Sequence, residues 1–240
     1  MIPLKDDNPT RITPLVTIGF IAVNALVFLY QWSLGSSGER IFVYQYGAIP
    51  AVVAGQQSLP AQIAAIPPML SIITSMFLHG GFMHIIGNML YLWIFGNNIE
   101  EAMGHVRFVV FYILCGILAS MAHILSDLHS TIPSIGASGA ISGVLGAYLL
   151  LYPRARVLTL VPLGFIMRLM YIPAGLVLSF WFVLQLISGS LGQGQAGGGV
   201  AWWAHVGGFV AGMLLVALFK KRDVRFFAPP QYHASRYVEW

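Results

Sequence analysis

The feature that most constrains this chain is a series of six apolar blocks, each about the length needed to cross a bilayer. A helix needs roughly 20 residues, rising about 1.5 Å each, to cross a hydrocarbon core about 30 Å thick. Hydrophobic residues make up 58% of the 240 residues and charged residues only 8%, a balance that excludes a soluble domain of this length. The blocks cover approximately residues 14–34, 81–99, 104–125, 138–153, 170–190 and 200–219. The sequence therefore predicts an all-α, polytopic membrane protein with a single six-helix bundle.

The distribution of basic residues predicts how this bundle lies in the membrane. If both termini are cytoplasmic, eleven of the twelve Lys and Arg residues lie on the cytoplasmic side, and only Arg40 lies outside. We therefore expect a cytoplasmic N-terminus (1–13), a membrane domain (14–219) and a cytoplasmic tail (220–240), with residues 35–70 at the outer interface. The net charge of +4 follows from this topology and requires no nucleic acid as a partner. The first block lacks a clear cleavage site, which favours a retained helix.

Three groups of polar residues lie inside the apolar blocks, where an unpartnered polar group costs several kcal/mol. The first is HGGFMHIIGN, in which His84 and Asn88 are four residues apart and so share one helix face. A purely structural role, in which both side chains hydrogen-bond across helices, is the competing interpretation.

The second group is IGASGAISGVLG, which places Ser138 between glycines at the start of a helix. Unpaired N–H groups and the positive end of the helix dipole surround a hydroxyl at such a position, which suits a developing oxyanion. Gly136 and Gly139 flank the serine and are expected to support the site. Taken alone, the motif is better explained by an N-cap serine and a small-residue packing face than by catalysis.

The third group is WWAHVGGFVAG, which places His205 just below an interfacial tryptophan pair. In the predicted topology, the blocks that carry His84, Ser138 and His205 all begin on the outer face. Small residues on two of these blocks let the backbones approach closely, so that His205 can reach the Ser138 hydroxyl.

A serine hydroxyl is a poor nucleophile until a neighbouring base removes its proton during attack, and an imidazole can be that base. Since all eight carboxylates are expected in termini or loops, we predict a catalytic dyad of Ser138 and His205 without a third member. His84, Asn88 and the backbone N–H of Ser138 are then the candidate donors to a tetrahedral oxyanion.

The motifs HGGFMHIIGN, GASGAISG and AHVGGFVAG resemble those of the rhomboid family of intramembrane serine proteases, in the same order and over about residues 71–219. The resemblance implies Ser138 as nucleophile, His205 as general base, and His84 with Asn88 as the oxyanion site. His79 matches another recurrent histidine of the family's motif, which implies a supporting role. The resemblance also implies cleavage of membrane-anchored proteins, without a cofactor or a metal. The chain departs from some members by having Ser142 where they have tyrosine.

Other interpretations remain open at this point. A zinc protease is disfavoured because no carboxylate accompanies His84 in HIIGN. Histidines on separate spans could ligate haem, and a noncatalytic rhomboid-like protein could bind membrane clients. Trp181, Phe182 and the glycine-rich loop 189–199 are candidates for a substrate gate, although packing explains the two aromatic residues equally well. The short N-terminus favours a bacterial plasma membrane.

Overall fold

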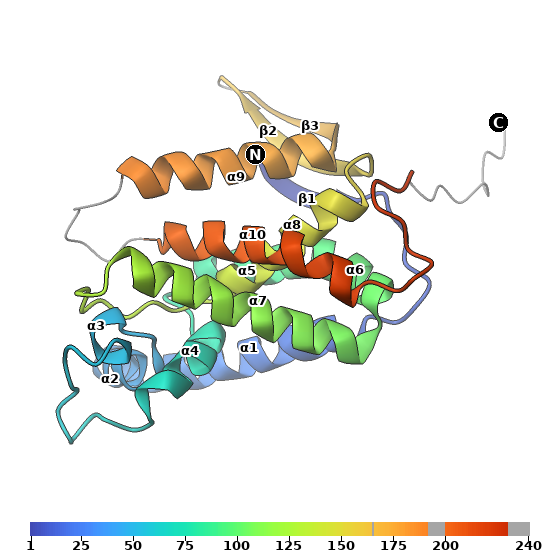
Figure 1. The fold of residues 1–240 in the computed structure, drawn as a ribbon. Coiled ribbons are helices and arrows are strands. Elements are labelled where there is room, and N and C mark those ends of the chain that lie inside the picture. Colours follow the sequence, from blue (N-terminus) through green and yellow to red (C-terminus); the bar gives the residue numbers. More distant parts are fainter. Residues whose placement is uncertain (165, 192–199, 230–240) are drawn as a thin grey trace, which may run out of the picture.

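A computed structural model describes residues 1–164, 166–191 and 200–229 as a mostly helical bundle (Figure 1). Within this described part, four helices are long and apolar enough to span a membrane. They are α1 (Leu15–Ser33), α7 (His105–Ser126), α9 (Ala174–Leu191) and α10 (Trp202–Phe219). These four coincide with expected spans, apart from shifts of a few residues at their ends.

The second expected span is broken into several helical pieces. It begins with α5 (Phe82–Tyr91), continues through a π-helical turn, η3 (Leu92–Gly96), and ends with α6 (Asn97–Met103). Before it lie η1 (Pro68–Leu70), α4 (Ser71–Thr74) and η2 (Ser75–Phe77). The stretches 68–77 and 82–103 meet at 81° and qualify together as one bent span, which brings the total to five at most.

The fourth expected span is the short helix α8 (Ser138–Leu151). At 14 residues it is about 21 Å long, which is less than the thickness of the hydrocarbon core. Eleven of those residues are buried, because α8 packs against α7, α9 and α10. A helix surrounded by other helices does not need to reach both interfaces, so six spans are not established by helix length.

The segment that was expected at the outer interface contains α2 (Gly35–Tyr46) and α3 (Pro50–Val53). Both lie at the end of the bundle opposite to β1 and α6 (Figure 1). Most of the expected loop 189–199 and the end of the tail lie outside the described residues.

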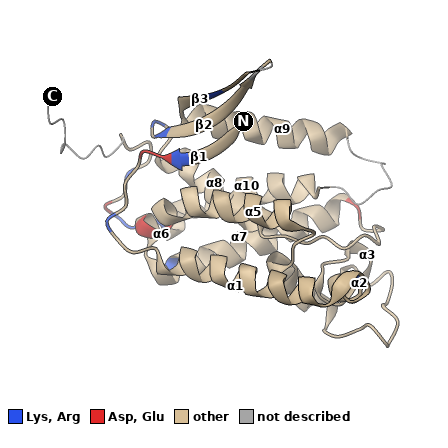
Figure 2. Cartoon of the chain, turned by 180° about the vertical axis from the view of Figure 1, so that it is seen from behind, with Lys and Arg blue, Asp and Glu red and all other residues tan. Residues whose placement is uncertain are grey.

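A three-stranded antiparallel sheet corrects the all-α prediction. Strand β1 (Ile2–Asp6) pairs with β2 (Arg156–Leu163), and β2 pairs with β3 (Ile166–Pro173). Gly164, with φ +64°, lies in the tight turn between β2 and β3. The sheet lies beside α9 in both ribbon views (Figures 1 and 2), and the fifth helix begins at Ala174, not at residue 170.

The prediction failed because short apolar runs such as LVPLGFIMRLMYIP fit a strand or the start of a helix equally well. In β2, Val157 and Thr159 are buried and alternate with more exposed neighbours, which is the period of a strand. That alternation was hidden because the residues on the other face are apolar as well.

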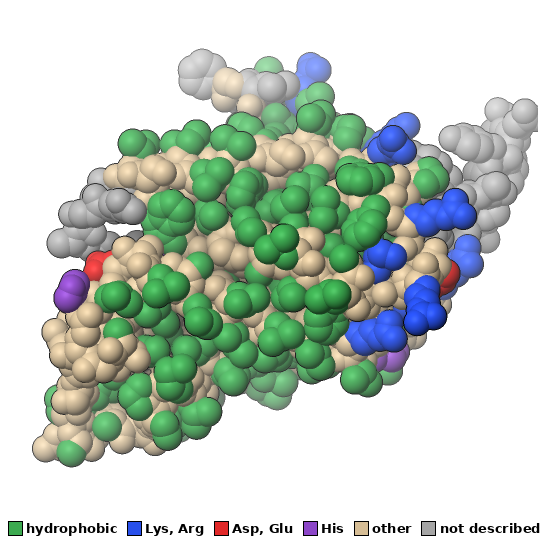
Figure 3. Space-filling view, in the orientation of Figure 1, with side chains coloured by type: hydrophobic (Ala, Val, Ile, Leu, Met, Phe, Trp, Pro, Cys, Tyr) green, Lys and Arg blue, Asp and Glu red, His purple; other side chains and the backbone are tan. Residues whose placement is uncertain are grey.

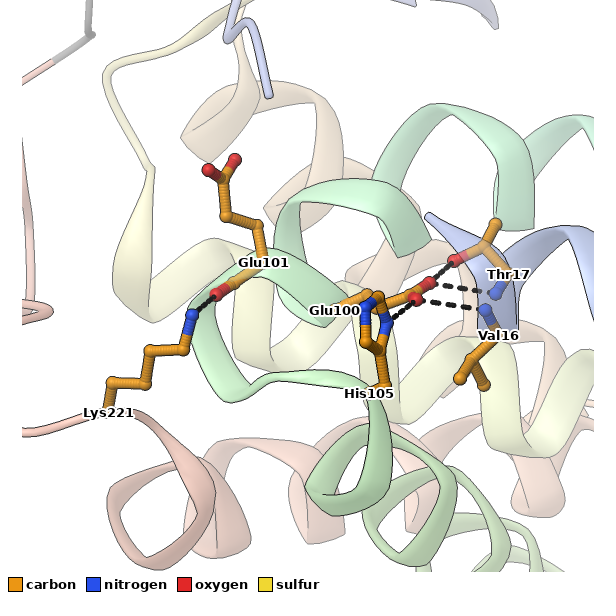
Figure 4. A network of polar contacts seen from close by, with 6 residues as sticks. All are labelled: Val16, Thr17, Glu100, Glu101, His105 and Lys221. Carbon is orange, nitrogen blue, oxygen red and sulfur yellow. Dashed lines mark hydrogen bonds and ion pairs between the residues drawn. The ribbon is translucent and has the colours of Figure 1, made fainter. Parts of the chain in front are cut away.

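Glu100 corrects a second expectation, that every carboxylate lies in a terminus or loop. It lies within α6, is fully buried and accepts hydrogen bonds from the backbone N–H groups of Val16 and Thr17 at 2.9 and 2.8 Å. The Thr17 hydroxyl donates at 2.7 Å, and His105 Nδ1 lies 2.6 Å away (Figure 4). The carboxylate therefore caps the N-terminus of α1, where unpaired N–H groups and the helix dipole favour an anion.

The C-terminal end of α10 is tied to α6 close by. Lys221 Nζ donates to the carbonyl oxygen of Glu101 at 2.8 Å (Figure 4), and the Lys221 backbone N–H donates to Ala102. Together with the contacts of Glu100, these hydrogen bonds join α1, α6 and α10 at one end of the bundle.

Helices α8 and α10 approach each other along a face of small residues. A Cβ on Gly208 would clash with the carbonyl oxygen of Gly139, and one on Gly212 would clash with that of Gly143. The backbones are therefore in direct contact, as the four-residue spacing of small residues predicts. This approach brings the first turns of the two helices together.

Candidate active site

The Ser138 and His205 side chains meet where α8 and α10 begin. Ser138 is the first residue of α8, and His205 lies in the first turn of α10. His205 Nε2 lies 2.8 Å from Ser138 Oγ, although 67 residues separate the two in the chain. His205 is only 8% exposed, so this contact forms in a largely desolvated place.

The loop before Ser138 is held by backbone hydrogen bonds to two other segments. Ser134 exchanges N–H···O bonds with Ala48 at 2.8 and 3.1 Å, and the Gly136 N–H donates to the Ser75 carbonyl oxygen at 2.9 Å. Gly136 has φ +123°, a conformation that favours glycine, and a Cβ there would lie 2.8 Å from the His84 ring. Gly139 instead lies where α8 packs against α7, and a Cβ there would clash with Ala119.

His84 and Asn88 extend from α5 toward this loop. A Cβ on Gly136 would lie 3.7 Å from Asn88 Nδ2, which is buried and has no hydrogen-bond partner among the described residues. The Gly80 N–H donates to His84 Nδ1 at 3.3 Å. A neutral imidazole that accepts at Nδ1 carries its proton on Nε2, which together with Cε1 is the part of the ring closest to a Cβ built on Gly136. Two side-chain donors therefore face the backbone next to Ser138.

His79 lies behind His84 and does not contact Ser138 or His205 by any hydrogen bond in the described structure. Gln31 on α1 donates to the His79 carbonyl oxygen at 2.6 Å, which anchors the loop. The two histidine rings meet edge to face at 5.1 Å. The structure therefore places His79 next to the predicted oxyanion residue, not next to the serine.

A small polar pocket opens beside Ser138. Its volume is about 20 Å³, and Ser75, Ser120 and Ser134 contribute to its lining. A cavity of this size has room for one water molecule, and hydroxyl groups are suitable partners for it.

Gln185 is a residue of the site that the sequence analysis missed. It lies on α9, is buried, and its Oε1 is 2.8 Å from His205 Nδ1. The search for a third member considered carboxylates alone, whereas this partner is an amide. The signal was available, because Gln185 is the one polar residue in the apolar run FWFVLQLI.

The aromatic residues proposed for a gate pack against α10. The Trp181 ring lies 5.7 Å from His205, and the Phe182 ring stacks on Phe209 at 4.5 Å. Trp202 meets His205 from a second side, edge to face at 6.1 Å. Ser142, which stands where some family members have tyrosine, does not pack against the imidazole as an aromatic ring would. Its hydroxyl donates to the Ser138 carbonyl oxygen one turn earlier in α8.

Within the described ranges, no group of three or more His, Cys, Asp or Glu side chains is arranged to hold a metal ion. The groups that the structure brings together at this site are a hydroxyl, an imidazole and several N–H donors.

The apolar helices and the polar residues buried between them define a multi-pass membrane protein. A family model described as the Rhomboid domain matches residues 68–222. The chain belongs to the rhomboid family, which confirms the family indicated by its motifs.

Three relatives illustrate the extent of the similarity. The Rhomboid protease GluP of Bacillus subtilis is 31% identical over 204 residues, which are 85% of this chain and 34% of that protein. Rhomboid protein 1, mitochondrial, of Saccharomyces cerevisiae is 33% identical over 149 residues, covering 60% of this chain and 40% of the relative. RHOMBOID-like protein 5 of Arabidopsis thaliana is 31% identical over 161 residues, covering 67% and 47%. The chain therefore spans less than half the length of each.

Proposed function

We propose that this protein is an intramembrane serine endopeptidase in which Ser138 is the nucleophile and His205 the general base. The observation that carries the proposal is the 2.8 Å contact between Ser138 Oγ and His205 Nε2. Membership of a family that includes proteins named as proteases supports it independently.

In this mechanism, Ser138 Oγ attacks the carbonyl carbon of the scissile peptide bond while His205 Nε2 accepts the hydroxyl proton. The protonated imidazole then gives this proton to the leaving amine. Water hydrolyses the acyl-enzyme in the second half of the reaction, with His205 again acting as base. The small pocket beside Ser138 is a suitable place from which that water could attack.

The oxyanion of each tetrahedral intermediate would receive hydrogen bonds from Asn88 Nδ2, His84 Nε2 and the Ser138 backbone N–H. The unpartnered amide of Asn88 supports this role, because a buried donor without an acceptor is costly unless the reaction supplies one. The N–H of the first residue of a helix likewise has no acceptor within that helix.

The substrates proposed are membrane-anchored proteins, cut in or near their membrane-spanning segment after entering the bundle from the side. We also propose six spans, with the short α8 counted as one, both termini in the cytoplasm, and a bacterial plasma membrane as the location. The basic side chains support this orientation, because most of those visible on this face gather toward one end of the molecule (Figure 3).

The test is cleavage of a labelled single-span substrate by detergent-solubilised protein. Ser138→Ala and His205→Ala are each expected to reduce the cleavage rate by about 10³-fold or more, because the two groups act as a unit. Ser142→Ala is the matched control, since it removes a hydroxyl one turn along the same helix, and it should retain activity. Labelling by a fluorophosphonate should disappear in Ser138→Ala alone among the two serine variants. Cleavage that survives in Ser138→Ala would overturn the role of Ser138 as nucleophile. Wild-type protein that neither cleaves the substrate nor reacts with the fluorophosphonate would overturn the protease function and favour a noncatalytic or haem-binding role.

A further inference from the structure

Both ring nitrogens of His205 have a side-chain partner. Nε2 faces Ser138 Oγ, and Nδ1 lies 2.8 Å from Gln185 Oε1. Gln185 and His205 are 6% and 8% exposed, so water does not compete strongly for either contact. In a buried place such a hydrogen bond has a strong influence on orientation.

The orientation of the Gln185 amide follows from its other hydrogen bond. Its Nε2 donates to the Trp181 carbonyl oxygen at 3.2 Å, one turn earlier on α9. Rotating the amide by 180° would place its oxygen against that carbonyl oxygen, which is an unfavourable contact between two acceptors. Oε1 is therefore the atom that faces His205.

This orientation determines the tautomer of His205. An amide oxygen only accepts, so Nδ1 must carry the hydrogen of the neutral ring. Nε2 is then left with a lone pair facing the Ser138 hydroxyl, which is the arrangement that a general base requires. The opposite tautomer would leave Nδ1 and Oε1 as two acceptors in contact.

We propose that Gln185 is a positioning residue that holds His205 in this tautomer and ring orientation, in the place where a triad has a carboxylate. The proposal rests on the proposed protease function. Trp181 and Trp202 pack against the same imidazole ring, which restricts its rotation. Two of these three neighbours belong to α9, so the position of this helix sets the position of the base.

The amide differs from a carboxylate in its electrostatics. When the imidazole becomes protonated during attack, Gln185 Oε1 still accepts the Nδ1 hydrogen, but it offers a dipole and no negative charge. The contribution of Gln185 is therefore orientation and tautomer selection, and its loss should slow the chemical step without weakening substrate binding.

The test compares Gln185→Leu, Gln185→Glu and wild type in steady-state cleavage of a single-span substrate. Gln185→Leu should lower kcat about 10- to 100-fold and change KM by less than about two-fold, because the acceptor for Nδ1 is lost. Gln185→Glu should recover most of kcat, since a Glu oxygen can accept the same hydrogen and its protonated form can still donate to Trp181. The rate of fluorophosphonate labelling at Ser138 should follow kcat in both variants.

Ser179→Ala is the matched control. Ser179 lies on the same helix at an exposed position outside the candidate gate, so the loss of its hydroxyl should leave kcat and KM unchanged. If Gln185→Leu retains kcat within about two-fold, or if Gln185→Glu fails to recover it while remaining folded, the positioning role is wrong. If wild type and Ser138→Ala cleave alike, the proposed function itself fails, which is a different outcome.

Discussion

At the residue scale, the environment of Asn88 is best explained by a role as hydrogen-bond donor to the oxyanion of the proposed reaction. Its amide is buried and faces the loop before Ser138, and Nδ2 has no hydrogen-bond partner in the part of the chain that the structure describes. Asn88→Ala should lower kcat by about 10²- to 10³-fold, the usual effect of removing one oxyanion donor. Asn88→Asp keeps the size but replaces the donor with an acceptor, so it should be at least as inactive. Steady-state cleavage measures both, and an Asn88→Asp variant with wild-type kcat would contradict the oxyanion role.

Asp6 gives a pH dependence at the same scale. Burial of its side chain raises the pKa of the Asp6 carboxyl to about 6. The hydrogen bond from Tyr148 acts in the opposite direction but is the smaller effect. The folded protein therefore holds this proton more tightly than the unfolded chain, whose Asp has a pKa of about 3.9. The free energy of unfolding should fall as pH rises from about 4 to about 6, because the charged form is desolvated in the folded state.

Denaturation in detergent at pH 4 and pH 7 checks this prediction. Asp6→Asn keeps an oxygen that can accept from Tyr148 and Asn98 but does not titrate, so it should show a smaller loss of stability over that interval. Equal pH dependence in the variant and wild type would rule out Asp6 as the source.

At the element scale, the contact between α8 and α10 depends on the absence of side chains. Gly208→Ala would force a methyl group against the Gly139 carbonyl oxygen and should destabilise the protein by about 1–3 kcal/mol. Since the same contact brings His205 to Ser138, activity should fall as well. Gly19→Ala on α1 is the matched control, because nothing lies within 4 Å of a Cβ there. Thermal unfolding that is the same in both variants would show that the close approach is not needed.

The Glu100 carboxylate that caps the N-terminus of α1 is a second stabilising feature at the element scale. Glu100→Ala would leave two backbone N–H groups and the Thr17 hydroxyl without their acceptor in a buried place, and should cost about 3–5 kcal/mol. Glu101→Ala is the control, because the neighbouring carboxylate bonds only the exposed Arg11 N–H among the contacts seen. Chemical denaturation should separate the two variants clearly, and similar midpoints would contradict the capping role.

At the scale of the whole molecule, the distribution of charge predicts how the protein lies in the membrane. Gln57 follows α3 in the chain and donates its backbone N–H to Ala51 of that helix. Arg222 follows α10 and Lys221, which is bonded to α6 at the opposite end of the bundle (Figure 1). In intact bacterial spheroplasts, an impermeant maleimide should label Gln57→Cys directly and Arg222→Cys only after permeabilisation. Cys115, the single native cysteine, is fully buried and should give little background. The reverse labelling pattern would overturn the proposed orientation.

Much of the helical architecture could be predicted from the sequence, because apolar blocks of about 20 residues have few alternatives in a bilayer. The positions of α1, α7 and α10 follow from block length alone. The motifs also identified the family, since three polar groups in one order are a specific pattern. By contrast, β2 and β3 escaped prediction because both faces of the hairpin are apolar, which removes the alternation that marks a strand.

What the sequence determined by itself is the type of protein and the residues whose chemistry demands an explanation, because polar groups inside apolar spans stand out without any structure. Only the tertiary structure decided which of them meet. The contact of His205 with Ser138 and Gln185 depends on how closely α8, α9 and α10 pack, and that distance is set by glycines and aromatic rings far from one another in the chain. Glu100 shows the same division, because its burial depends on the folding of α1 back against α6.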